Sequence, residues 1–145
     1  METTETVALW VPSQTRYLSL VGACAVEICR YIEQLPVPEQ TTYDVQLAVN
    51  EAVVNTIKHA YGNRPDGRVK VVFSLLPQRL QIDVYDWGEG FDLTTVSEPD
   101  LEEPSESGYG LMIIKRLMDE VSYHRDPVQG NRLHLVKYLG EGDHA

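Results

Sequence analysis

The hydrophobic positions near the start of this chain change their period once, and the change separates a strand from a helix. Residues 7–11 alternate between apolar and less apolar side chains, which predicts a strand that ends at Pro12. From residue 15 to residue 34 the apolar side chains recur at helical spacing, and Ser13 is the expected N-cap. The chain is therefore expected to begin with a strand and a helix.

A second helix and a hairpin are predicted next. The helix covers residues 39–60 and ends at the glycine- and proline-containing segment 62–67. Apolar residues alternate over 69–73 and again over 80–84, and the turn at 77–79 joins the two runs.

The rest of the chain is predicted as a long loop at 87–107, a helix at 109–118, strands at 121–125 and 133–139, and a frayed tail. This order is typical of an α+β fold, in which helices cover one face of a mostly antiparallel sheet. Neither an internal repeat nor a linker is visible, so residues 1–145 are predicted to form a single domain.

Composition narrows the range of partners. The chain has 145 residues with 12 Lys and Arg against 22 Asp and Glu, a formal net charge of -10. Nucleic acids and anionic membranes bind preferentially to basic protein surfaces, so neither is expected as a direct partner of this acidic chain. A phosphate ligand held by backbone amides or by a metal remains compatible with this charge.

The cysteines and the N-terminal residues indicate the compartment. Cys24 and Cys29 are five residues apart, so on a helix they would point about 140° away from each other, which excludes a local disulfide. Residues 1–12 lack the basic and apolar regions of a signal peptide, and no apolar run is long enough to cross a bilayer. We therefore expect a soluble cytoplasmic protein.

The second predicted helix carries a narrow polar arc of about 60° that contains Asp44, Glu51, Asn55 and Lys58. Glu51 and Asn55 are one turn apart, so their side chains are neighbours. This arc fits a solvated helix face. It also fits a site in which the amide oxygen binds Mg²⁺ and the carboxylate orients a nucleophile or accepts its proton.

Two glycine-containing segments are further candidates. Asp86 ends a predicted strand and is followed by Gly88 and Gly90, which fits either a simple turn or a site where a carboxylate accepts a hydrogen bond from an exocyclic amine. Ser107, Gly108, Tyr109, Gly110 and Leu111 open a predicted helix, and unpaired amides at a helix N-terminus can bind an anion. The second segment lacks the ending of a P-loop and the parallel unit of a dinucleotide-binding fold.

The order of these three segments resembles that of a known superfamily. Residues 50–61 (Asn-Glu-Ala-Val-Val-Asn-Thr-Ile-Lys-His-Ala-Tyr) resemble the N box of the GHKL ATPases, which have the Bergerat fold. Residues 86–91 resemble the first glycine box, and residues 107–111 resemble the second. The His-Ala-Tyr sequence and the short chain narrow the resemblance to the anti-sigma factor/serine-protein kinases of the RsbW and SpoIIAB type, over about residues 5–139.

This resemblance implies a fold and a set of roles. The fold would be a two-layer sandwich of a mixed, mostly antiparallel sheet and about three helices, with an ATP lid at 92–107. Glu51 would be the catalytic base or a polarising group near the γ-phosphate, Asn55 would bind Mg²⁺ and Asp86 would recognise adenine. The remaining residues implied in ATP or ADP binding are Lys58, His59, Gly88, Gly90, Ser107, Gly108, Tyr109, Gly110, Leu111 and Asn131.

The same resemblance implies partners. Members bind a sigma factor, phosphorylate a serine or threonine of a STAS-domain antagonist, and commonly form homodimers. Two positions depart from the family pattern: Ser105 and Glu106 stand before the second glycine box, where an Arg is frequent, and Asn131 follows Gly130, where a Thr is frequent. The first departure bears on handling of the γ-phosphate.

The acidic residues are concentrated around the predicted site. The 35 residues from Leu80 to Ile114 contain nine acids and neither Lys nor Arg. The phosphates of a nucleotide would therefore depend on Mg²⁺ and on helix amides for neutralisation.

Three hypotheses follow from these features. The first is an ATP-dependent protein-serine/threonine kinase that controls sigma-factor availability by partner switching. The second is a nucleotide-gated binding module without kinase activity. The third is an acidic interaction protein whose glycines only form turns.

Overall fold

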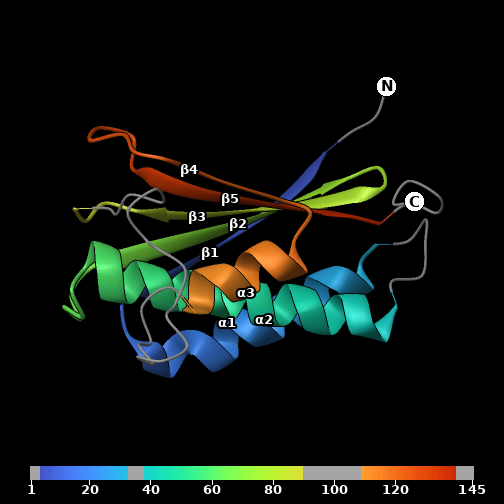
Figure 1. The fold of residues 1–145 in the computed structure, drawn as a ribbon, viewed down its shortest axis with the longest axis horizontal. Helices are drawn as coiled ribbons and strands as arrows, with labels where there is room; N and C mark the ends of the chain where they lie inside the picture. Colours follow the sequence, from blue (N-terminus) through green and yellow to red (C-terminus); the bar gives the residue numbers. More distant parts are fainter. Residues whose placement is uncertain (1–3, 33–37, 90–108, 140–145) are drawn as a thin grey trace.

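Five strands form one sheet, and helices pack on one face of it, as Figure 1 shows for the computed structural model, which describes residues 4–32, 38–89 and 109–139. The strand order is β1-β2-β3-β5-β4. The strands are β1 (Glu5–Pro12), β2 (Arg68–Leu76), β3 (Arg79–Asp86), β4 (Glu120–His124) and β5 (Asn131–Tyr138). All four pairings are antiparallel, so the described strands include no parallel pair, although a mixed sheet was expected.

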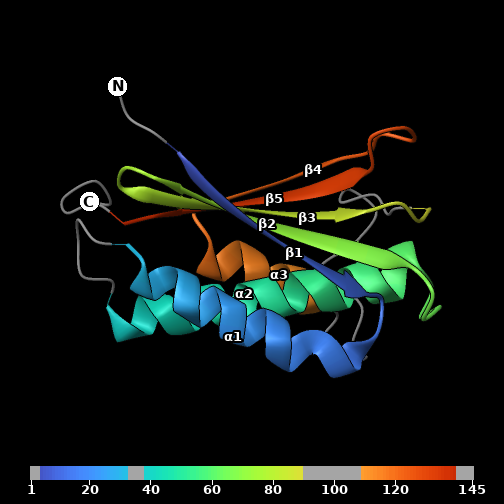
Figure 2. The ribbon, with the colours of Figure 1, turned by 180° about the vertical axis from the view of Figure 1, so that it is seen from behind.

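The helical layer places its central helix over the middle of the sheet. Its elements are a 3₁₀ turn (Thr15–Tyr17), α1 (Leu18–Arg30), α2 (Glu39–Asn55), a π-helical turn called η2 (Thr56–Ala60) and α3 (Tyr109–Leu117). Helix α2 contacts both α1 and α3, and the reverse view in Figure 2 shows α1 on its other flank. The predicted α+β class with about three helices on one face is confirmed.

The hydrophobic core lies between α2 and the central strands. Alternate residues of β2 and β3 point toward the helices, as the period of two requires. The fully buried members with the largest side chains include Phe73, Leu80, Ile82, Ile114, Leu133 and Leu135. Burial of each such side chain contributes about 1.5–3 kcal/mol to folding. The core therefore holds β3 and α2, which carry the candidate residues, against each other.

The start of the first helix differs from the prediction. Ser13 does not cap it: its hydroxyl donates to the carbonyl of Arg64 (2.5 Å) and accepts from the N–H of Gly67 (3.0 Å). Helix α1 begins later, at Leu18, and its N-terminus has no side-chain cap. The side chain of Ser13 joins the end of β1 to the segment before β2, a long-range contact that local sequence does not reveal.

The second helix changes its geometry just after Asn55. The N–H of Tyr61 bonds to the carbonyl of Thr56 (3.2 Å), a π-type spacing, and the hydroxyl of Thr56 bonds back to the carbonyl of Ala52 (3.0 Å). Side-chain bonds of this kind compete with the helix ladder, and π turns are frequent at functional sites. The predicted helix over 39–60 is therefore confirmed in extent, with a π turn in its last five residues.

The other face of the sheet carries exposed aromatic side chains. Trp10 and Trp87 stack with ring centroids 5.4 Å apart, and they are 48% and 38% exposed. The guanidinium of Arg68 lies over both rings, and the ammonium of Lys70 lies over Trp10.

None of the helices described by the structure is long and apolar enough to cross a membrane.

Candidate functional site

The polar arc of α2 faces α3. Asn55 is buried, with 6% of its surface exposed, and its Nδ2 atom has no hydrogen-bond partner among the described residues. Glu51, one turn earlier, is half-buried. A fully solvated helix face would leave Asn55 exposed, so the structure disfavours that interpretation of the arc. An unpaired buried amide costs about 1–3 kcal/mol, which a ligand would relieve.

Gly110 allows α3 to approach this pair. A Cβ at position 110 would lie 2.8 Å from Oε2 of Glu51 and 3.2 Å from Nδ2 of Asn55. The first turn of α3 contains no acidic residue, and the carboxylate of Glu51, from α2, lies beside this positive helix end. The structure thus brings Glu51, Asn55 and Gly110 together at one place.

The other predicted residues of the second glycine segment can be placed only in part. Tyr109 is the first residue of α3, and Leu111 is buried with 3% exposed surface. Ser107 and Gly108 lie outside the described residues, as do Gly90 and the predicted lid at 92–107.

Asp86 is a buried carboxylate whose two oxygens have different surroundings. Oδ1 accepts from the N–H of Gly88 (3.1 Å) and from Nδ2 of Asn131 (2.8 Å). Oδ2 is buried and has no partner among the described residues. Burial raises the pKa of Asp86, and the bonds from Asn131 and Gly88 and the charge of Arg125 oppose this rise. One oxygen is therefore fixed by the protein and the other can accept a donor from a ligand.

The turn after Asp86 is bonded to the end of the α2–η2 helix. The N–H of Trp87 donates to the hydroxyl of Tyr61 (2.8 Å), which in turn donates to the carbonyl of Arg68 (2.6 Å). The N–H of Glu89 donates to the carbonyl of Ala60 (3.0 Å). Since Ala60 is only five residues after Asn55, these bonds connect the Asp86 region to the Glu51–Asn55 region through one rigid element.

Gly88 is required by this same connection. A Cβ at position 88 would lie 2.3 Å from the carbonyl oxygen of Ala60, which is backbone and cannot move aside cheaply. The prediction from the sequence was that Gly88 allows a nucleotide to approach the backbone closely. The structure gives it a packing role against η2, which is sufficient by itself to require glycine.

Lys58 and His59 lie on η2, immediately after Asn55, and both are half-buried. Burial and the charge of Lys58 lower the pKa of His59. His59 is therefore neutral near pH 7, and Lys58 is the residue of this pair that brings positive charge to the site.

Two contributors to the site were not predicted from the sequence. Tyr61 is only the last residue of a motif in the sequence, yet its hydroxyl accepts a hydrogen bond from the backbone N–H of Trp87. Arg125, from the turn between β4 and β5, donates to the carbonyl of Glu89 (2.8 Å). The acidic 80–114 segment contains no cation of its own, and Arg125 supplies one from a distant part of the chain. Its exposed position in a turn gives no local signal of this contact.

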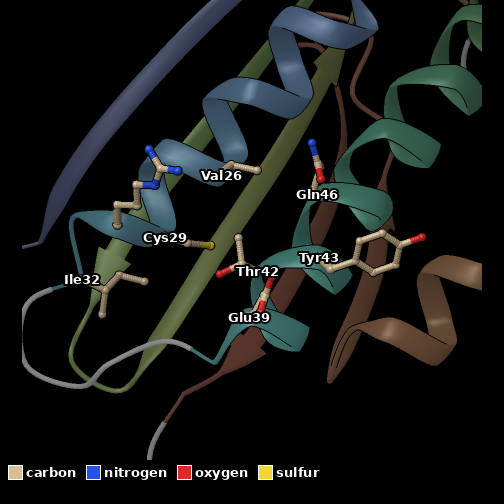
Figure 3. A pocket seen from close by; sticks show the side chains of 8 residues that line it. Val26, Cys29, Ile32, Glu39, Thr42, Tyr43 and Gln46 are labelled. Atoms are coloured by element: carbon tan, nitrogen blue, oxygen red, sulfur yellow. The ribbon is translucent and has the colours of Figure 1, made fainter.

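A separate cavity lies at the other end of α2. It has a volume of about 570 Å³ and is lined by the side chains shown in Figure 3, from the last turns of α1 and the first turns of α2. Burial raises the pKa of the Cys29 thiol in its wall, and a hydrogen bond with Thr42 opposes the rise. None of the predicted site residues lines this cavity, so it is distinct from the site described above.

Comparison with known proteins places these features in a family. The family described as "Histidine kinase-like ATPase domain" matches residues 11–137. Among curated proteins, "Serine-protein kinase RsbW" of Oceanobacillus iheyensis is 27% identical over 143 residues, which cover 93% of this chain and 87% of that protein. The protein of the same name from Listeria monocytogenes is 29% identical over 143 residues, with 93% and 88% covered.

Two solved structures share the fold. The crystal structure of the RsbU and RsbW domains of a Mycobacterium tuberculosis protein has a TM-score of 0.66 at 18% identity, covering 93% of this chain and 32% of that one. The blue-light activated histidine kinase EL346 of Erythrobacter litoralis has a TM-score of 0.57 at 22% identity, covering 89% of this chain and 42% of that one. This chain thus spans less than half the length of either.

Proposed function

Because the chain belongs to the family of histidine kinase-like ATPase domains, we propose that it binds ATP and transfers the γ-phosphate to a serine or threonine of a small regulatory protein. The observation that carries the proposal is a pair of buried polar atoms that have no hydrogen-bond partner within the described part of the chain, Oδ2 of Asp86 and Nδ2 of Asn55. Asn55 ends α2 and Asp86 ends β3, and the hydrogen bond from Glu89 to Ala60 links the two regions, so we place the phosphates of a nucleotide at the first and its base at the second. The names of the curated relatives support the serine kinase reaction.

In the proposed complex the base lies at Asp86 and the phosphates lie at the N-terminus of α3. Oδ2 of Asp86 accepts a hydrogen bond from the exocyclic amine of adenine. The amides of the first turn of α3, from Gly110 onward, bind the phosphates, together with Lys58. Gly90, Ser107, Gly108 and Tyr109 complete the site as the resemblance implies.

Asn55 is the proposed protein ligand of Mg²⁺. Its amide oxygen is a hard donor, and the carboxylate of Glu51 is one turn away. The described residues contain no group of three or more His, Cys, Asp or Glu side chains that could hold a metal ion. Mg²⁺ usually keeps waters and phosphate oxygens in its shell, so one amide oxygen from the protein is compatible with its binding. When bound, it would neutralise charge on the transferred phosphoryl group.

Glu51 is the proposed general base. The Oγ of the substrate serine attacks the γ-phosphorus, and the bond from that phosphorus to the β–γ bridging oxygen breaks, so that ADP leaves. Glu51 accepts the proton of the serine hydroxyl, while the amide of Asn55 and the N-terminus of α3 hold the phosphates in line.

The proposed partners are a sigma factor and a STAS-domain antagonist, in the cytoplasm. Binding of the sigma factor would block transcription. Phosphorylation of the antagonist would prevent the antagonist from releasing the sigma factor.

We also propose a homodimer, with Trp10 on the uncovered face of the sheet as part of its surface. A Trp10→Ser variant should then sediment as a monomer, and a monomeric parent protein would contradict the dimer.

The test of the kinase proposal is transfer of labelled phosphate from ATP to a candidate STAS-domain protein. Phosphate on a serine or threonine of that protein supports the kinase. Glu106, where the family often has Arg, favours a second candidate, a nucleotide-gated binding module. Nucleotide binding without transfer to any STAS partner would select this second candidate.

A further inference from the structure

Asn131 and Asp86 face each other across the edge of the proposed base site. They are register partners at the start of β5 and the end of β3. Nδ2 of Asn131 donates to Oδ1 of Asp86 (2.8 Å) and to the carbonyl of Gly88 (3.2 Å). Its Oδ1 accepts from the N–H of Asp126 (3.3 Å). The side chain is buried, with 5% of its surface exposed.

These contacts leave Asn131 without a free donor. An asparagine amide has two N–H donors, and both are used within the protein. The resemblance implied that Asn131 contacts the nucleotide directly, whereas its contacts fit a different role. We propose that Asn131 is a positioning residue, which acts on the purine base only through Asp86 and makes no hydrogen bond to it by its own donors. This inference rests on the proposed binding of ATP.

The two oxygens of Asp86 have different surroundings, and this difference affects which base the site selects. Asn131 and Gly88 hold Oδ1, so Oδ2 is directed away from them, and none of the residues that the structure describes bonds to it. An ionised carboxylate only accepts hydrogen bonds, so it favours a 6-amino purine over a 6-oxo purine. A protonated carboxyl group can donate to a 6-oxo oxygen instead. The preference for adenine therefore depends on keeping Asp86 ionised.

Asn131 contributes to this ionisation. Burial raises the pKa of Asp86, and the hydrogen bond from Asn131 is the first of the interactions that oppose the rise. Loss of that bond should move the ionisation of Asp86 to higher pH. The elements around the turn carry these other charged or titratable groups: Lys58 and His59 on η2, Glu89 in the turn itself, and Arg125 and Asp126 between β4 and β5.

The experiment compares the full chain with two variants of this residue. Asn131→Leu has nearly the same volume and cannot donate, whereas Asn131→Thr keeps a hydroxyl donor toward Asp86. Binding of ADP and of inosine diphosphate, both with Mg²⁺, is measured by calorimetry from acidic to neutral pH. Thermal unfolding of each protein is measured in the same buffers.

The proposal predicts about tenfold weaker binding of ADP by Asn131→Leu, because Asp86 loses the hydrogen bond that keeps its carboxylate ionised and oriented toward the base. It also predicts that the loss of ADP affinity on acidification occurs at higher pH, and that the preference for ADP over inosine diphosphate falls over the same range. Asn131→Thr should stay close to the parent. A parental pH profile and base preference in Asn131→Leu would overturn the proposal. A parent protein that binds no ADP would overturn the proposed function instead.

A second measurement needs no variant and decides the question even if Asn131→Leu does not fold. In nitrogen–proton NMR spectra of the ligand-free protein, both Nδ2–H signals of Asn131 should already be protected from exchange and should shift as Asp86 titrates. Signals that exchange rapidly and become protected only when ADP is added would show a direct contact with the nucleotide and overturn the proposal.

Discussion

At the scale of single residues, Asp86 shows a conflict between stability and function. The side chain is almost completely buried, with 1% of its surface exposed, and one of its oxygens has no hydrogen-bond partner in the described ranges of the chain. Burial raises its pKa above the unfolded value of 3.8. The folded protein thus binds the proton more tightly than the unfolded chain does, and this part of the stability is lost as the pH rises through the folded-state pKa. Above the folded-state pKa, the buried ionised group destabilises the fold.

Asp86→Asn should therefore bind ADP more weakly and unfold at higher temperature at neutral pH. The asparagine oxygen still accepts from Gly88 and Asn131, while the buried charge is gone. Affinity should fall by about tenfold or more, since a hydrogen bond to a carboxylate is lost. The gain in unfolding temperature over the parent should disappear as the pH falls below the unfolded pKa of Asp86. Calorimetry and thermal unfolding across pH measure the two effects.

Asp83→Asn is the matched control. Asp83 lies on the same strand but on the uncovered face of the sheet, where Nδ1 of His134 is 2.6 Å from its Oδ1. Its replacement should leave ADP affinity unchanged. Equal losses of affinity in both variants would show that Asp86 has no special role in recognising the base.

At the scale of elements, the site depends on two close approaches that involve glycine. Gly88 lies against the backbone of η2, and Gly110 brings α3 against the end of a flexible side chain, that of Glu51. Backbone cannot yield without moving the element, whereas the end of a side chain can turn away. The two glycines should therefore respond differently to the same substitution.

Gly88→Ala should destabilise the ligand-free protein by about 1–3 kcal/mol, the usual cost of overpacking a close contact. Urea unfolding measures this change. Gly22→Ala is the control, since a Cβ at that position in α1 meets only the side chains of Asn50 and Gln46. The gain in helix propensity offsets this crowding, so its stability should change by less than about 1 kcal/mol. A Gly88→Ala protein as stable as the parent would contradict the packing of the turn on η2.

Gly110→Ala should keep its stability and lose activity. Its Cβ would force the carboxylate of Glu51 away from its position, while alanine suits a helix. A displacement of about 1 Å can reduce phosphoryl transfer by about a hundredfold. Transfer assays beside thermal unfolding test this, and a full parental rate would show that the position of Glu51 is not critical.

The sequence predicts most elements of the fold but not the junctions between them. Periodicity was sufficient for all five strands and the three α-helices, and the spacing of Glu51 and Asn55 placed them on one helix face. Contacts between distant segments determine three of these junctions. They are the π turn, the hydrogen bond from the N–H of Trp87 to the hydroxyl of Tyr61, and the bond from the hydroxyl of Ser13 to the carbonyl of Arg64. Local propensity carries no signal of such contacts, which is why Ser13 was expected to be a helix cap.

At the scale of the whole molecule, the negative charge is localised. Nine of the 22 acids lie between Leu80 and Ile114, a stretch without Lys or Arg. In the described part of the chain, Arg125 contacts the backbone within this stretch at Glu89. This stretch offers a bound triphosphate no Lys or Arg of its own, so we expect its binding to depend on a divalent ion and on the amides of α3.

Removal of divalent ions should therefore abolish most of the nucleotide affinity. Calorimetry of ATP binding with Mg²⁺ and with EDTA tests this, and about a hundredfold loss or more is expected for a polyphosphate with uncompensated charge. Adenosine, which has no phosphates, is the control and should bind equally in both buffers. Undiminished ATP affinity in EDTA would show that protein cations neutralise the phosphates.

Glu51 is the residue on which the proposed phosphoryl transfer depends most, as the base that accepts the proton of the substrate serine. The most direct measurement is the single-turnover rate of phosphate transfer from ATP to a STAS-domain serine by the parent, Glu51→Gln and Asp44→Asn. Asp44 lies two turns before Glu51 on the same helix, and its asparagine can still accept from Gln40. We predict a fall of about 10²–10⁴ for Glu51→Gln with unchanged ADP affinity, and a parental rate for Asp44→Asn. A parental rate of transfer in Glu51→Gln would contradict the role of Glu51 as the base.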